Sequence, residues 1–265
     1  MSHLGGALAA EPFIRWDWVR DHTDDIRSNF WEHVQLTVLA VGIGFVIALA
    51  MALVAVRWRA LYGPLAAFCA ALYSVPSVAL FALLLPFVGL GTTNALIALV
   101  TYTLLILLRN IVAGLDGVPP DVREAADGMG FEGWRRVLRV DLPLATPAII
   151  AGLRIATVTT IGLVTVTALV GEGGFGRFIN DGLSRQFATP IVLGSVLSVA
   201  LAIACDVLFV LLERVMTPWT RAGARPGRRR GGRDDRADAM LRGLTQGQAD
   251  DRLSAPGRGI GPFGA

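Results

Sequence analysis

Long apolar runs with few charged residues dominate this sequence, and most charges gather between the runs and at the two ends. Residues 36–56 form the first run, 21 positions without a charge, which would be about 31 Å long as a helix. That length matches the hydrocarbon core of a bilayer. Four later runs, at 61–88, 95–115, 147–170 and 191–212, predict further spans. We therefore expect an all-α integral membrane protein with five transmembrane helices.

The second predicted span contains two interruptions. The stretch from Ser74 to Pro76 forms one break, and Pro86 forms the other, because proline removes a helical hydrogen bond. Cutting the span at Pro76 would leave two pieces too short to cross a bilayer. We therefore expect one broken span rather than two.

Composition narrows the class of protein. With 54% hydrophobic residues among 265, the chain has more apolar surface than a soluble core needs, which indicates one membrane domain. A net charge of +3 gives no support for nucleic-acid binding. Cys69 and Cys205 lie inside apolar runs, where thiols act as small hydrophobes. All three histidines precede the first span, and the sequence contains no catalytic, metal-binding or Walker motif, so we expect no catalytic residue, metal or cofactor.

The two ends differ from the centre, 36–212, which is the predicted transmembrane domain. Residues 1–35 alternate aromatic side chains such as Trp16 and Trp31 with acids and arginines. This pattern predicts an uncleaved segment at the membrane interface, although a floppy polar leader fits equally well. Residues 213–265 are rich in Gly, Arg, Pro and Asp, and they predict a disordered tail.

Arginine placement predicts the orientation in the membrane. Near the ends of the five spans, thirteen arginines lie on one side and five on the other. Because the positive side is cytoplasmic, we expect the N-terminal segment outside, and the loop 116–146 and the C-terminal tail inside. A six-span alternative would move Arg57 and Arg59 outside, which is less consistent with this rule.

The loop 116–146 carries a spaced motif. It reads Glu-Ala-Ala, three residues, Gly, nine residues, then Val, any residue, and Leu-Pro. Alanines let the backbone approach a partner closely, a carboxylate is a strong hydrogen-bond acceptor, and glycine allows a sharp turn. The candidate contact residues are Glu124, Ala125, Ala126, Gly130, Leu142 and Pro143.

Local signals around the motif predict two short helices joined by a turn. Asp121 and Glu124 have capping-box spacing, which would start the first helix at residue 122. The second would cover 132–140, and Pro143 would end it because the residue before a proline disfavours the helical region.

This motif resembles the EAA loop of ABC-importer membrane subunits, and every motif position matches. In that family the loop is a coupling helix that docks on a cytoplasmic ATPase. The resemblance implies a type I ABC importer permease bundle in which the partner subunit, not this chain, uses ATP. An ordinary amphipathic loop is the alternative reading.

Three other stretches, 73–77, 153–157 and 172–183, are similar to the permeases of osmoprotectant importers. The resemblance covers roughly 33–212, and Glu172 departs from it where a small residue is usual. Those importers take up glycine betaine, choline and related quaternary ammonium solutes. The resemblance implies an extracytoplasmic substrate-binding protein, cytoplasmic ATPase subunits and a second permease copy or paralogue as partners, in contact with membrane lipid.

Two stretches are candidates for the translocation path or its gate, because discontinuous helices place unwound backbone at membrane depth. A phosphate-binding loop at 171–176 is excluded, since no strand precedes it and no lysine follows. Helix kinking alone is the alternative. The candidate residues are Ser74, Pro76, Gly171, Glu172, Gly173, Gly174 and Gly176.

Arg154 and Asp206 are charges inside predicted spans. Counted from the cytoplasmic ends of their spans, both lie roughly 9 to 10 Å deep. A charge at that depth is costly and an opposite charge offsets the cost, so we predict an intramembrane pair. Snorkelling of the arginine to the headgroups is the alternative.

The resemblance implies a permease subunit of the cytoplasmic membrane that translocates an osmoprotectant. Amino-acid and methionine importers share the loop, so they remain an alternative. An ion-coupled secondary transporter would need intramembrane carboxylates and repeat symmetry, whereas only Asp206 is available and no repeat is visible. A structural membrane anchor would leave the motif at Glu124 unexplained.

Overall fold

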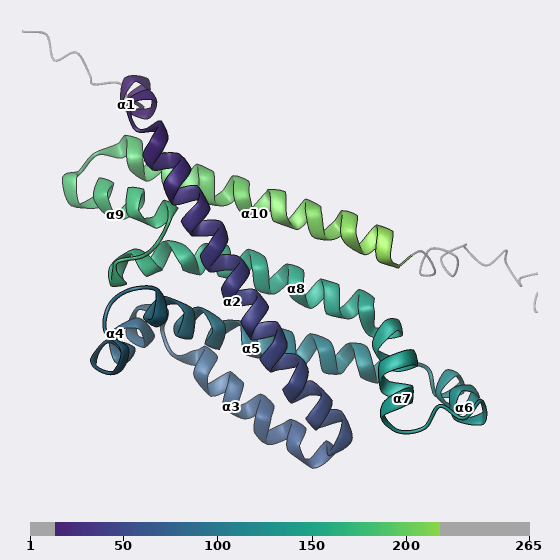
Figure 1. Ribbon diagram of the computed structural model, residues 1–265. Helices are drawn as coiled ribbons and strands as arrows, with labels where there is room; N and C mark the ends of the chain where they lie inside the picture. Colours follow the sequence, from purple (N-terminus) through teal and green to yellow (C-terminus); the bar gives the residue numbers. More distant parts are fainter. Residues whose placement is uncertain (1–13, 218–265) are drawn as a thin grey trace, which may run out of the picture. The chain divides into compact units, whose positions relative to one another are not determined.

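The computed structural model describes residues 14–217, and every regular element in that range is helical (Figure 1). The predicted all-α class is confirmed. Most of the predicted C-terminal tail, and residues 1–13, lie outside the described range. The elements are α1 (Trp16–Asp21), α2 (Thr23–Arg57), η1 (Arg59–Leu61), α3 (Tyr62–Ser74), α4 (Ser77–Val88), α5 (Thr92–Asp116), α6 (Pro120–Gly128), α7 (Trp134–Arg136), η2 (Val137–Asp141), α8 (Leu142–Val164), η3 (Thr165–Val170), α9 (Phe175–Arg185) and α10 (Ala188–Met216).

Four helical segments in this range are long and apolar enough to cross a membrane, and a bent pair of helices supplies a fifth if it counts as one span. This agrees with the five predicted spans. The helices also extend past the predicted limits. α2 begins at Thr23 rather than at residue 36, and α10 continues to Met216 rather than ending at 212.

The predicted break in the second span is a sharp corner. The segments Arg59–Ser74 and Ser77–Val88 meet at 96°, with Val75 and Pro76 in extended conformation between them. The hydroxyl of Tyr102 in α5 donates a hydrogen bond to the Val75 carbonyl, which ties the corner to the bundle. The second predicted interruption is wrong, because Pro86 lies inside α4. Membrane helices tolerate proline when the surroundings satisfy the freed carbonyl.

The centre of the bundle is the packing of α2 against α5, which cross in Figure 1. Ala48, Ala52 and Ala55 of α2 are fully buried in one cluster with Leu107 and Leu108 of α5. Small residues on one helix let the other approach closely, which gives dispersion contact without a hydrophobic driving force between helices. α8 packs on both α5 and α2, and α10 packs on α8 and α9.

The loop 116–146 differs from its predicted structure in two places. Its first helix begins at Pro120, with Pro119 as N-cap and no side-chain cap, so the predicted capping box at Asp121 is wrong. Proline suits the first helical turn because its missing amide would be unpaired there. Pro143 does not end the second helix either. It occupies the first turn of α8, after a π-helical turn at Val137–Asp141, and helical structure continues from Trp134 to Val170.

Candidate functional site

α6 presents the Glu-Ala-Ala motif at the surface. Glu124 and Ala125 are exposed, whereas Ala126 faces inward and is 1% exposed. Within residues 14–217 Glu124 has no ion pair, so its carboxylate is available to a partner. Gly130 follows with φ of 82°, which turns the chain sharply after the helix. Exposed apolar side chains surround the motif, which is typical of an interaction surface: Val122, Met129, Trp134 and Leu138.

The other two motif residues lie elsewhere. Leu142 packs against the central core cluster, and Pro143 is exposed at the start of α8. These residues therefore connect the loop to the transmembrane helix, whereas Glu124, Ala125 and Gly130 are exposed on the loop itself.

A charged network that the motif did not reveal holds the loop together. Asp141 is buried, with its carboxylate 3.5 Å from Nε of Arg123 and 3.6 Å from Nε of Arg136. Arg136 Nη1 also donates to both carboxylate oxygens of Asp127, at 2.8 and 2.7 Å. The network joins α6, α7 and η2. The motif leaves position 141 unspecified, and nothing in its neighbours signals that it is buried.

The loop 171–174 is built on the N-terminal half of α2. Glu32 Oε1 accepts hydrogen bonds from the amides of Gly173 and Gly174, at 2.8 and 3.1 Å. Both glycines have positive φ, and this conformation turns their two consecutive N–H groups toward one carboxylate. Adjacent amides in such a turn form an anion-binding concavity, and here a side chain of the same protein fills it.

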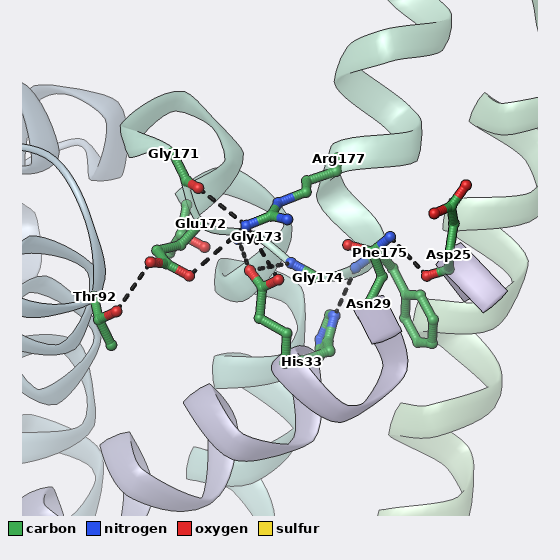
Figure 2. Close-up of polar contacts among 12 residues, drawn as sticks. Asp25, Asn29, His33, Thr92, Gly171, Glu172, Gly173, Gly174, Phe175 and Arg177 are labelled. Carbon is green, nitrogen blue, oxygen red and sulfur yellow. Dashed lines mark hydrogen bonds and ion pairs between the residues drawn. The ribbon is translucent and has the colours of Figure 1, made fainter. Parts of the chain in front are cut away.

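Glu172 and Arg177 extend this contact to α5 and α9, as Figure 2 shows. Glu172 Oε1 accepts a hydrogen bond of 2.9 Å from the Thr92 hydroxyl at the start of α5. Arg177 Nη2 lies 3.1 Å from Glu32 Oε2 and 3.9 Å from Glu172 Oε2, and it donates to the Gly171 carbonyl at 3.1 Å. Glu172, which departs from the family pattern, therefore has two side-chain partners, Thr92 and Arg177.

His33 is buried beneath the same loop, as Figure 2 shows. Its Nδ1 lies 3.4 Å from the Phe175 amide and its Nε2 lies 3.1 Å from the Ile161 carbonyl. Because the amide donates, Nδ1 is the acceptor and Nε2 carries the proton. The arrangement fits a neutral imidazole that joins α2, α8 and α9. Sequence reasoning missed Glu32, His33 and Arg177 as partners of this loop.

The predicted path residues form two separate groups. The Ser74 hydroxyl donates to the Ala71 carbonyl at 2.7 Å within α3, and Pro76 starts α4 at the corner. No hydrogen bond or ion pair within residues 14–217 joins these residues to the loop 171–174. Gly176 has a packing role: a Cβ there would lie 2.0 Å from the Thr165 carbonyl oxygen, so α9 contacts η3 through backbone.

The structure brings Arg154 of α8 and Asp206 of α10 together. Arg154 donates to both carboxylate oxygens through Nε and Nη2, the latter at 2.8 Å from Oδ2. Both side chains are only partly covered in the isolated chain. The pair links α10 to the bundle by a bidentate, charge-assisted contact.

We expect the two charges to be energetically coupled. Arg154→Ala and Asp206→Ala should each lower the thermal stability of the purified protein, because each leaves an unpaired charge at membrane depth. The double variant should lose less than the two single losses combined. A midpoint-of-unfolding measurement on all four proteins gives the coupling. Strictly additive losses of thermal stability would show that Arg154 and Asp206 are not energetically coupled.

Comparison with known proteins gives matches over most of the chain. The family model described as "Binding-protein-dependent transport system inner membrane component" matches residues 40–218. The osmoprotectant import permease protein OsmW of Salmonella typhimurium is 34% identical over 206 residues, covering 76% of this chain and 96% of that protein. The glycine betaine/carnitine/choline transport system permease protein OpuCB of Bacillus subtilis is 34% identical over 187 residues, covering 71% and 86%.

Solved structures share the fold. The MetNI methionine ABC transporter in an inward facing conformation, in its CY5 native crystal form, aligns with a TM-score of 0.66 at 23% identity, covering 72% of this chain and 96% of that one. An amino acid ABC transporter with histidines aligns with a TM-score of 0.65 at 19% identity, covering 76% and 98%. At such identities the likeness concerns the fold alone.

Proposed function

Because this chain belongs to the binding-protein-dependent transport system inner membrane components, we propose that it carries an osmoprotectant, such as glycine betaine, choline or a related quaternary ammonium solute, across the cytoplasmic membrane. The observation that supports this substrate class is the 34% identity to two permeases named for osmoprotectants, over more than two thirds of this chain. The chain acts as the permease subunit, with ATP hydrolysed by a separate ATPase.

The exposed motif on α6 is the proposed ATPase contact. A cytoplasmic ATPase would bind Glu124 and the apolar residues around it, and the network at Asp141 would make the loop move as one body. From Trp134 a helical segment runs to Val170, directly before the loop that Glu32 holds. Movement of the ATPase would thus reach the opposite end of the permease along a single segment. There an extracytoplasmic binding protein would deliver the solute, and a second permease copy or paralogue would complete the path.

Import of methionine or another amino acid is the second candidate. The loop motif favours it, because importers of those solutes share the Glu-Ala-Ala loop, whereas the structural neighbours share the fold alone. Because those matches are below 25% identity, whereas the osmoprotectant relatives reach 34%, the osmoprotectant assignment is the stronger. Membership of the family argues against an ion-coupled secondary transporter.

Uptake measurements test the substrate class. The chain is expressed with its ATPase and binding protein in cells that lack their own uptake systems, and radiolabelled glycine betaine, choline and methionine are supplied at high osmolarity. We expect accumulation of a quaternary ammonium solute that stops when the ATPase is inactivated. ATPase-dependent accumulation of methionine alone would support the amino-acid importer instead.

We also propose that the N-terminus is outside and the C-terminal tail is cytoplasmic. Single cysteines at Ser28 and Ser254, in a background with Cys69 and Cys205 replaced by alanine, test this orientation. An impermeant thiol reagent should label position 28 in intact cells and should reach position 254 only after the cells are broken. Labelling of 254 alone in intact cells would reverse the topology. Position 254 lies outside the described residues.

A further inference from the structure

A polar pocket lies where the end of α2 meets the loop 116–146. Its volume is about 410 Å³. Its charged and aromatic lining residues are Arg57, Arg59, Arg123, Trp134, Arg136 and Asp141. Four cationic side chains and one carboxylate therefore line this pocket.

The positive charge of the pocket is only partly neutralised. Arg59 pairs with Asp116, which lies outside the lining. The contacts of Asp141 with Arg123 and Arg136, at 3.5 and 3.6 Å, are too long for hydrogen bonds. Both Nε atoms are buried without a hydrogen-bond acceptor.

Of the four arginines that line the pocket, Arg57 has no carboxylate partner within residues 14–217. Its guanidinium carbon lies 5.8 Å from the ring centroid of Trp58, which leaves its hydrogen-bond donors available to a ligand. Counting Asp116, Asp127 and Asp141 against the four arginines leaves the group with one net positive charge. An added anion therefore meets a favourable potential.

The pocket also lies at the end of a candidate membrane span, where lipid headgroups are expected. α2, a candidate membrane span, ends at Arg57. The neighbouring Trp58 is more than half exposed, and an exposed tryptophan at the end of a span is typical of the membrane interface. A ligand that reaches this pocket from the bilayer would present its phosphate to Arg57.

We propose that this pocket binds the phosphate of an anionic phospholipid headgroup from the cytoplasmic leaflet. Guanidinium groups match the geometry of phosphate oxygens, and basic pockets on the cytoplasmic side of membrane proteins bind anionic headgroups. The bound headgroup bridges Arg57 at the end of α2 and Arg136 in the proposed coupling loop. The choice of leaflet rests on the orientation in the proposed function, whereas the pocket itself does not.

Native mass spectrometry of the full-length chain in mild detergent tests the proposal. Phosphatidylglycerol or phosphatidylcholine is titrated in, and the retained lipid is counted. We expect preferential retention of phosphatidylglycerol, with an affinity about fivefold weaker in Arg57→Gln, the change expected for one charge near an anionic headgroup. Arg57→Lys, which keeps the charge, should recover part of the loss. Arg135→Gln, an exposed arginine outside the lining, is the matched control and should behave as wild type.

Three results would overturn the lipid assignment. The first is equal retention of phosphatidylglycerol by Arg57→Gln and wild type, and the second is an equal loss of affinity in Arg135→Gln. The third is displacement of the lipid by millimolar inorganic phosphate in wild type but not in Arg57→Gln, which would assign the pocket to a soluble phosphate compound. Elution from a size-exclusion column as wild type shows that a variant is folded. Because the readout needs no transport, a chain that retains the lipid but imports no quaternary ammonium solute would contradict the proposed function alone.

Discussion

Replacing Glu124 with lysine is expected to stop solute uptake while the permease stays folded in the membrane. Glu124 is exposed and has no ion pair within residues 14–217, so the fold does not depend on its charge. In a complex with the ATPase, the lysine would face the cationic or N–H groups that bind the Glu124 carboxylate in the wild type. Loss of one partner of a buried charge pair costs about 2–5 kcal/mol in a protein interface, which is at least about a 30-fold loss of binding.

The measurement is co-purification of the ATPase with the permease, together with uptake in cells. Gly130→Asp is expected to give the same result, because it adds a side chain at a left-handed φ of 82° on the same surface. Glu132→Lys is the matched control: the charge change is the same, the residue is exposed in the same loop, and position 132 is one that the motif leaves unspecified. Wild-type ATPase yield and normal uptake by the Glu124→Lys variant would refute the docking assignment.

Gly176→Ala is expected to destabilise the end of the permease opposite the coupling loop, where α9 contacts η3 through backbone. The new Cβ would lie 2.0 Å from the Thr165 carbonyl oxygen and 2.6 Å from its Cα, and backbone atoms cannot move aside as a flexible side chain does. Overpacking of this kind costs about 1–3 kcal/mol. In a domain of this size we expect the midpoint of thermal unfolding to fall by about 2–12 °C.

Gly162→Ala provides the control for this prediction. Gly162 is also helical, but a Cβ there meets nothing within 4 Å, so alanine should leave the midpoint unchanged or raise it slightly through helix propensity. Fluorescence-detected size-exclusion chromatography after heating measures both variants in detergent extracts. If the midpoint of thermal unfolding falls equally in both variants, or does not fall in Gly176→Ala, the close approach of α9 to η3 does not limit stability.

The apolar runs were sufficient to predict the helical class and the number of spans. Bilayer thickness sets the length of each run, so this information is local and can be read without any tertiary contact. The motif at Glu124 was sufficient to identify the family for the same reason, because its positions are close in sequence. The corner at Pro76 was also predictable, since proline acts on its own helix.

Local rules failed at the ends of helices, where packing competes with propensity. Pro143 was expected to end a helix, and instead a π-helical turn before it lets the segment continue into α8. Asp121 was expected to cap α6 and start it at residue 122, but the helix starts two residues earlier, at Pro120. At Pro120 proline fits within the first helical turn, where an amide donor is not required, whereas Pro143 directly follows the π-helical turn inside a continuous helical segment.

Only the tertiary structure revealed the contacts between distant residues. Glu32 and Gly173 are 141 positions apart, and Arg123 meets Asp141 across the loop. The hydrogen-bonding groups of these residues are ordinary in the sequence, and their partners depend on which helices pack together. The sequence alone therefore determined which segments are long and apolar enough to cross a membrane and which surface is proposed to bind a partner, because both depend on local composition. The tertiary structure decided how the two ends of the permease are held, because this depends on charges and amides that only the packed helices bring within hydrogen-bonding distance.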